Sequence, residues 1–175
     1  MSLTKKDYYD NNIYYGEINP ITQKRAGLGI YVYKHGDIYF GLWRDNSLME
    51  GTYIFKNGDC FEGYVKNGKQ GRGKYYYANG NIYEGEWQDD LKHGLGKLFY
   101  SNGDSYEGLW HKGKKHGYGT YFYRSGTIYR GIFHNGKKHG IGIVDFSDGT
   151  KIEALWVANT IEGKGKIFYK NGDFF

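Results

Sequence analysis

Residues 106–126 read YEGLWHKGKKHGYGTYFYRSG, and two near-copies flank them: YEGEWQDDLKHGLGKLFYSNG from residue 83 and YRGIFHNGKKHGIGIVDFSDG from residue 129. The three copies begin 23 residues apart. A fixed period of this length is the signature of a repeat architecture, in which each copy is one supersecondary unit stacked on its neighbours. The fold therefore depends on the structure of a single copy.

Each copy contains a turn signal. A glycine within a polar tetrad such as SNGD or KNGD recurs every 22 or 23 residues, at Gly36, Gly58, Gly80, Gly103, Gly126, Gly149 and Gly172. Asn-Gly and Asp-Gly between hydrophobic runs predict hairpin turns, because both residues tolerate positive φ.

The runs between turns alternate as β-strands do. In the fifth copy Tyr106, Gly108 and Trp110 are spaced by two, which places them on one face of a strand. A polar loop follows, and then a second alternating run that contains Gly117, Gly119, Tyr121 and Tyr123. Glycine at alternate positions lets aromatic rings lie close over the backbone. The sequence predicts an all-β fold: an elongated single-layer antiparallel meander of about seven stacked hairpins, open and curved, not a closed barrel.

The repeat register also gives boundaries. YYDNNIY at residues 8–14 resembles YYANGNIY at 76–83, so an N-terminal half-repeat or cap is predicted at residues 1–13. Seven repeats are predicted at 14–38, 39–60, 61–82, 83–105, 106–128, 129–151 and 152–175.

The pattern Y-E-G-x-W-x-x-G-x-x-H-G-x-G-x-Y-x-Y at this period resembles the MORN (membrane occupation and recognition nexus) repeat, from about Tyr14 to Asp173. The resemblance implies a non-enzymatic scaffold that binds a protein partner or self-assembles at a cytoskeletal or membrane-proximal structure. Two alternatives stay open. One is peripheral binding to an anionic, phosphoinositide-rich membrane, and the other is a role as an accessory or targeting subunit of an enzyme complex.

Composition and charge indicate which partners and which cellular compartment to expect. The 24 basic and 19 acidic residues are interspersed, and the net charge of +5 is too small to indicate nucleic acid. The single cysteine, Cys60, fits a reducing compartment. No apolar run resembles a signal peptide or approaches the ~18 residues of a membrane span. We expect a cytoplasmic protein, associated with the cytoskeleton or with the cytosolic face of a membrane.

No catalytic motif is evident, so we expect neither an enzyme nor a cofactor. Six histidines raise the question of a metal site. His93, His116 and His139 share one repeat position, and His111 and His134 share another. Equivalent positions two strands apart are separated by roughly 10 Å, which is too far for two ligands of one zinc ion. We therefore expect no metal site within one chain and no need for a divalent ion in folding; a site formed between the two chains of a dimer stays open.

Three surfaces are candidate binding sites. An aromatic face is expected to bind a protein partner unless its side chains pack only on one another; it comprises Tyr83, Trp87, Tyr100, Tyr106, Trp110, Tyr121 and Tyr123. A basic loop edge is expected either to be solvated or to contact an acidic membrane or partner; it comprises Lys114, Lys115, Lys137 and Lys138.

The third surface is the last strand, GKGKIFYK, whose outer backbone groups are expected to lack a partner. An unprotected strand edge that carries aromatic residues is a template for pairing with a second chain. We therefore expect homodimerisation through an edge formed by Ile167, Phe168, Phe174 and Phe175.

Overall fold

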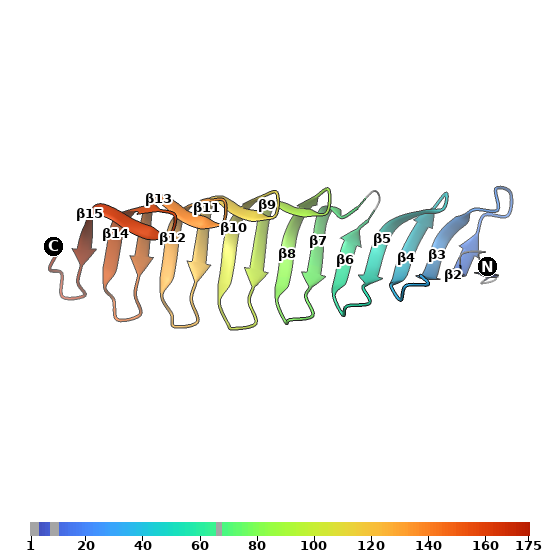
Figure 1. Ribbon diagram of the computed structural model, residues 1–175, viewed down its shortest axis with the longest axis horizontal. Coiled ribbons are helices and arrows are strands. Elements are labelled where there is room, and N and C mark those ends of the chain that lie inside the picture. Colours follow the sequence, from blue (N-terminus) through green and yellow to red (C-terminus); the bar gives the residue numbers. More distant parts are fainter. Residues whose placement is uncertain (1–3, 8–10, 66–67) are drawn as a thin grey trace. The chain divides into compact units, whose positions relative to one another are not determined.

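The computed structural model describes residues 4–7, 11–65 and 68–175, and all regular secondary structure within these ranges is β-strand. The chain divides into two compact units, Met1–Asp90 and Leu91–Phe175. Within each unit the strands follow one another in sequence order, and the printed pairs are antiparallel (Figure 1). The prediction of an open antiparallel meander of hairpins is confirmed.

The strands of the first unit are β1 (Thr4–Asp7), β2 (Ile13–Ile18), β3 (Arg25–Val32), β4 (Ile38–Arg44), β5 (Ser47–Ile54), β6 (Cys60–Tyr64), β7 (Gln70–Tyr76) and β8 (Ile82–Gln88). Those of the second unit are β9 (Leu91–Phe99), β10 (Ser105–His111), β11 (Lys114–Phe122), β12 (Ile128–His134), β13 (Lys137–Asp145), β14 (Lys151–Val157) and β15 (Thr160–Phe168). Strand β1 pairs with β2 ahead of the first full repeat. Residues 8–10, part of the motif that predicted a half-repeat, lie outside the described residues.

Two kinds of turn connect the strands, and the predicted hairpin turns at the Asn-Gly and Asp-Gly positions are three-residue loops. At residues 101–103 only Gly103 has positive φ, at 93°. The Gly103 amide donates to the carbonyl of Tyr100, and the Tyr100 amide donates to that of Asp104, each at 3.0 Å. This is a three-residue loop closed by a left-handed glycine.

The tight two-residue turn lies in the segment interpreted as a polar loop. Lys112 and Gly113 have φ of 48° and 80°, as a type I′ turn requires. Strand β11 consequently begins at Lys114, immediately after the turn. The residues KKH at 114–116 therefore alternate between the two faces of the sheet instead of forming one loop edge.

The Tyr-x-Gly-x-Trp motif builds the core of each repeat. The Tyr106 side chain is 0% exposed, and its hydroxyl donates to the carbonyl of Leu109 at 2.9 Å. Its ring lies against Gly119 on β11, where an added Cβ would be 2.4 Å from the hydroxyl oxygen. The Trp110 indole N–H donates to the carbonyl of Gly96 on β9 at 3.1 Å. Glycine is thus needed where the rings cross the backbone, as the sequence predicted.

The two glycines of each G-x-G pair have different roles. Gly119 makes room for a ring, whereas Gly117 adopts a φ of 61° beside a register shift between Gly108 and Trp110. That shift is a β-bulge, a place where a left-handed residue is accommodated and the strand bends. The second glycine of the pair therefore makes room for a core ring, and the first adopts a left-handed conformation beside a bulge.

Candidate functional site

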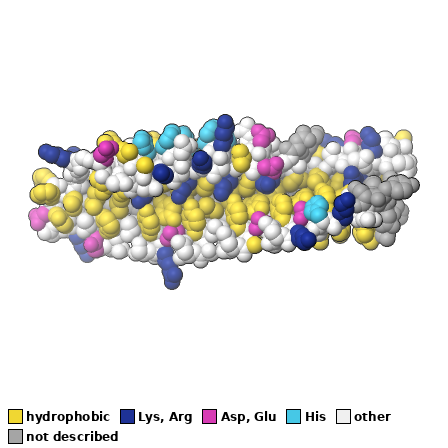
Figure 2. All heavy atoms as spheres, in the orientation of Figure 1, with side chains coloured by type: hydrophobic (Ala, Val, Ile, Leu, Met, Phe, Trp, Pro, Cys, Tyr) yellow, Lys and Arg dark blue, Asp and Glu magenta, His cyan; other side chains and the backbone are white. Residues whose placement is uncertain are grey.

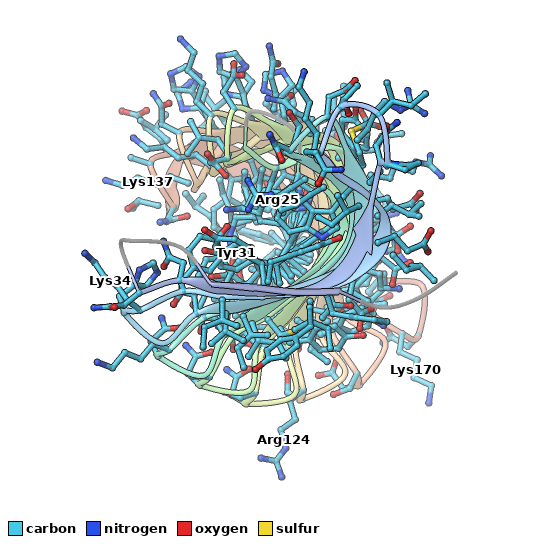
Figure 3. All side chains as sticks on the ribbon, turned by 90° about the vertical axis from the view of Figure 1, so that its right-hand side faces the viewer. Arg25, Tyr31, Lys34, Arg124, Lys137 and Lys170 are labelled. Atoms are coloured by element: carbon cyan, nitrogen blue, oxygen red, sulfur yellow. The ribbon has the colours of Figure 1, made fainter. Side chains whose placement is uncertain are left out.

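The sheet of each unit has two distinct faces. The inner face carries Tyr106 and Trp110 and their equivalents in other repeats, and the outer face carries the residues between them, such as Glu107 and Leu109. In the first unit Arg25 and Tyr31 point into the curve of the sheet, whereas the turn residue Lys34 points away from it (Figure 3).

The predicted aromatic face is the inner face, but more than half of its residues are core. Tyr83 and Tyr106 are fully buried, and Trp87 and Trp110 are 5% exposed. Tyr100, Tyr121 and Tyr123 are half-buried and keep part of their surface accessible. Of the seven predicted partner-binding residues, only these three offer a partner appreciable surface.

The cover over the buried rings comes from basic side chains of the chain itself. In the second unit the Lys115 Nζ lies 4.7 Å from the centre of the Tyr121 ring, and the Lys138 Nζ lies 4.6 Å from that of Trp156. The guanidinium of Arg25 lies 4.4 Å from the Trp43 ring in the first unit. Each of these basic side chains lays its aliphatic part along the aromatic rings and makes a cation–π contact with its charged end.

The predicted basic edge is therefore two separate rows. Lys115 and Lys138 are half-buried on the inner face, whereas Lys114 and Lys137 are exposed on the outer face. Burial, together with the positive charges of Lys138 and Lys92, lowers the pKa of Lys115 to about 8. The inner lysines are thus partly desolvated cations next to aromatic rings.

An aromatic residue stands at the end of a strand, just before each three-residue turn, and we call these the rim aromatics. They are Tyr33, Phe55 and Tyr77 in the first unit, and Tyr100, Tyr123, Phe146 and Tyr169 in the second. Each of the first five is half-buried, and the last two are more exposed. The ring of Tyr123 packs against that of Tyr121, with ring centres 4.6 Å apart. The rim aromatics are the accessible part of the inner face.

A carboxylate binds the residues next to the rim aromatic Tyr123. The Asp104 carboxylate accepts a hydrogen bond from the Tyr121 hydroxyl at 2.9 Å and another from the Arg124 backbone amide at 2.8 Å. The hydrogen bond from Arg124, with others, lowers the pKa of Asp104. Two turns of the first unit repeat the arrangement, with Asp37 between Tyr53 and Lys56 and Asp59 between Tyr75 and Ala78. The carboxylates therefore hold the turn that follows each of three rim aromatics and the tyrosine that stands two residues before it.

The outer face of the second unit carries an exposed apolar row that the sequence analysis missed. The strand register pairs Leu109 with Leu95, Tyr118 with Ile132, and Ile141 with Leu155. Tyr118 is 71% exposed and Ile141 is 65% exposed. The signal was present in the sequence, because these residues alternate with the core positions. Contiguous exposed apolar side chains mark interaction surfaces.

The histidines of the second unit also lie on the outer face, in one row. One set, His93, His116 and His139, lies on β9, β11 and β13. The other set, His111 and His134, lies on β10 and β12, so the two sets alternate along the row. Neighbouring ring centres are 5.1–5.7 Å apart along His93, His111, His116, His134 and His139. In Figure 2 histidine side chains gather along one edge of this half.

The predicted dimer edge is partly covered. The amide of Ile167 donates to the carbonyl of Phe175, and the amide of Phe175 donates to that of Ile167, each at 2.8 Å. The expectation that all outer backbone groups of this strand lack partners is therefore wrong at its C-terminal end. Phe168 and Phe174 form a single antiparallel bridge there. Self-association through β15 stays a prediction.

Comparison with known proteins gives a family and a fold. The family model described as the MORN repeat matches residues 39–60, 61–82, 83–105, 106–128, 129–151 and 153–174. No curated protein sequence matches the chain.

Among solved structures, the TCP domain of Drosophila melanogaster SAS-4 (dCPAP), in complex with a proline-rich motif of Ana2 (dSTIL), is 17% identical with a TM-score of 0.58. The match covers 99% of this chain and 87% of that domain. The TCP10 domain of Danio rerio CPAP, in complex with a STIL peptide, is 11% identical with a TM-score of 0.41, over 99% and 97% of the two chains. At 17% identity the likeness to the Drosophila domain concerns the fold alone.

Proposed function

Because the chain belongs to the MORN repeat family, we propose that it is a non-catalytic scaffold, which captures an extended, proline-rich segment of a protein partner along its rim aromatics. The family resemblance favours a cytoskeletal or membrane-proximal site for this partner.

The observation that carries the proposal is a match of two spacings. Within a unit, the rim aromatics recur on every second strand, and strands lie ~4.8 Å apart, so successive rings stand ~9.6 Å apart along the sheet. A polyproline II helix has three residues per turn and rises ~3.1 Å per residue, so it repeats every ~9.3 Å. A segment with proline at every third residue would therefore meet one ring per repeat.

The chemistry of the rim suits such a ligand. Proline-rich segments dock in aromatic-lined grooves, and their preformed helix loses little entropy on binding. Tyr100 and Tyr123 are half-buried, so each is held in position while an edge or face stays accessible. The likeness to the Drosophila domain, which is in complex with a proline-rich motif, agrees with this choice of ligand.

The inner lysines add a preference for acidic residues between the prolines. Lys115 and Lys138 lie beside the rim aromatics Tyr100 and Tyr123, with Nζ to ring-centre distances of 5.8 and 5.3 Å. With a pKa of about 8, Lys115 is mostly protonated at pH 7, and a carboxylate brought near it would favour that charged form. The best ligand is thus proline-rich and acidic.

The test is fluorescence anisotropy with two labelled acidic peptides of equal composition, one with proline at every third residue and one with proline at every fourth. We expect the first to bind and the second to bind at least tenfold more weakly. Tyr123→Ala should weaken binding of the first by about tenfold, or ~1.4 kcal/mol, because one of the rings that contact the peptide is lost. The matched control is Tyr118→Ala on the outer face. Equal affinity for the two peptides would contradict the proposal.

A second candidate, contact with an anionic membrane, is favoured by the outer face. The exposed apolar row of the second unit runs beside Lys114 and Lys137, so apolar contact and charge attraction are available together. None of the described residues forms a helix that could cross a bilayer. The same surface would also suit an enzyme for which this chain is an accessory or targeting subunit. Co-purification of the enzyme with the chain would detect such a complex.

Sedimentation with anionic vesicles separates the two rows of lysines. Lys114→Glu with Lys137→Glu should abolish sedimentation at 0.1 M salt, because the charges that face the membrane are reversed. Lys115→Gln with Lys138→Gln should leave it unchanged. Binding by the first variant, or salt-insensitive binding by the unmodified chain up to 1 M, where the Debye length is ~3 Å, would exclude the outer lysines as a membrane contact.

A further inference from the structure

The histidine row of the second unit contains two kinds of neighbour. His93 and His111 continue the register that pairs Gly94 with Trp110, so they are directly opposite on adjacent strands, and their ring centres are 5.1 Å apart. His116 and His134 likewise continue the Gly117–Phe133 pair, with ring centres 5.2 Å apart.

The remaining contacts are diagonal. His111 pairs directly with Lys114, so His116 lies two residues further along, and the ring centres are 5.6 Å apart. His134 and His139 are related in the same way, at 5.7 Å. The row therefore consists of two direct pairs and one histidine, His139, without a direct counterpart among the histidines.

The spacing of the direct pairs is that of two imidazoles on one zinc ion. Zinc binds imidazole nitrogen at ~2.0–2.1 Å, which places the ion ~3.2 Å from each ring centre, and tetrahedral coordination then sets the two centres ~5.2 Å apart. A square-planar or octahedral ion with adjacent ligands would need ~4.5 Å. The separations of 5.1 and 5.2 Å fit the tetrahedral case.

We propose that His93 with His111, and His116 with His134, each form a two-histidine zinc site on the outer face. Among the described residues no three His, Cys, Asp or Glu side chains converge on one point, so water completes each coordination sphere. The sites lie outside the inner face and are independent of the proposed peptide binding.

A metal binds the neutral form of imidazole, and the basic side chains beside these histidines do not attract a cation. Lys114 and Lys137 stand directly opposite His111 and His134, so the ions are held by coordination and not by charge attraction. The contact of 3.1 Å between the His134 Nε2 and the Asn135 amide is replaced when the ion binds.

Isothermal titration of the full chain with zinc chloride at pH 7.5, in a non-coordinating buffer, tests the assignment by stoichiometry. We expect two ions per chain, one ion for His111→Asn or His134→Asn, and none for the double variant. His139→Asn is the matched control and should still bind two ions. At pH 5 the binding should be lost, because protons compete for the same nitrogens.

Other results would overturn the proposal. If His139→Asn lowers the stoichiometry as much as His111→Asn does, binding follows the number of histidines and not the direct pairs. Two ions in the double variant, or no binding by the unmodified chain, would exclude the sites. Circular dichroism melts of each variant check that lost binding does not come from lost folding.

Discussion

Replacing Gly119 by valine should destabilise the chain far more than replacing its neighbour Thr120 by valine. A Cβ at Gly119 would lie 2.4 Å from the Tyr106 hydroxyl oxygen and 2.5 Å from a ring carbon. The Tyr106 ring cannot easily move away, because it is fully buried and its hydroxyl donates a hydrogen bond to the carbonyl of Leu109. Overpacking of this kind costs ~1–3 kcal/mol, and more where the backbone must shift.

Thr120→Val is the matched control because Thr120 alternates onto the outer face, opposite Glu107 and Arg130. Thermal unfolding measures the difference: each 1 kcal/mol lowers the midpoint by ~2–4 °C in a chain of this size. We expect a fall of several degrees for Gly119→Val and almost none for Thr120→Val. Equal falls would mean that the two faces have been assigned the wrong way round.

Removal of the Trp110 side chain should have the second large effect. The indole is 5% exposed, packs edge-on against Tyr106 with ring centres 5.3 Å apart, and is covered by the Lys92 Nζ at 4.7 Å. Truncation of a buried tryptophan to alanine typically costs ~3–5 kcal/mol, and here it also leaves the Gly96 carbonyl without its indole donor.

Tyr118→Ala on the outer face is the control for size and aromaticity. Tyr118 is 71% exposed, so its loss should change stability by less than ~0.5 kcal/mol. Urea unfolding of both variants gives the comparison. A tryptophan variant as stable as the tyrosine variant would show that the inner face is not the core.

The sequence predicted which residues share a face of the sheet, but not how exposed that face is. Spacing by two placed Tyr106, Gly108 and Trp110 on one face correctly, because strand alternation depends only on local geometry. It could not show how much of that face is accessible. The aromatic face was expected to bind a protein partner unless its side chains packed only on one another, yet the side chains of Lys92, Lys115 and Lys138 also lie over it. Long basic side chains cover apolar surface in this way, and their direction depends on where the strand begins.

The position of one turn accounts for most of what was missed. Interpreting HKGKKHG as a loop placed Lys114 and Lys115 on a single edge, whereas the type I′ turn at Lys112 and Gly113 starts β11 at Lys114. Alternation then separates the two lysines and places His116 on the same face of the sheet as His111. The interleaved histidine row follows from that register, which composition and spacing alone did not specify.

The central claim is that the rim aromatics of the inner face bind a proline-rich segment. Its most direct test is a nuclear magnetic resonance titration of the chain carrying ¹³C-labelled tyrosine rings, assigned by Tyr→Phe substitutions, with the peptide that has proline at every third residue. We predict that the ring signals of Tyr100 and Tyr123 shift with added peptide while those of Tyr118 stay in place. Shifts confined to Tyr118, with Tyr100 and Tyr123 unmoved, would contradict the claim and assign binding to the outer face.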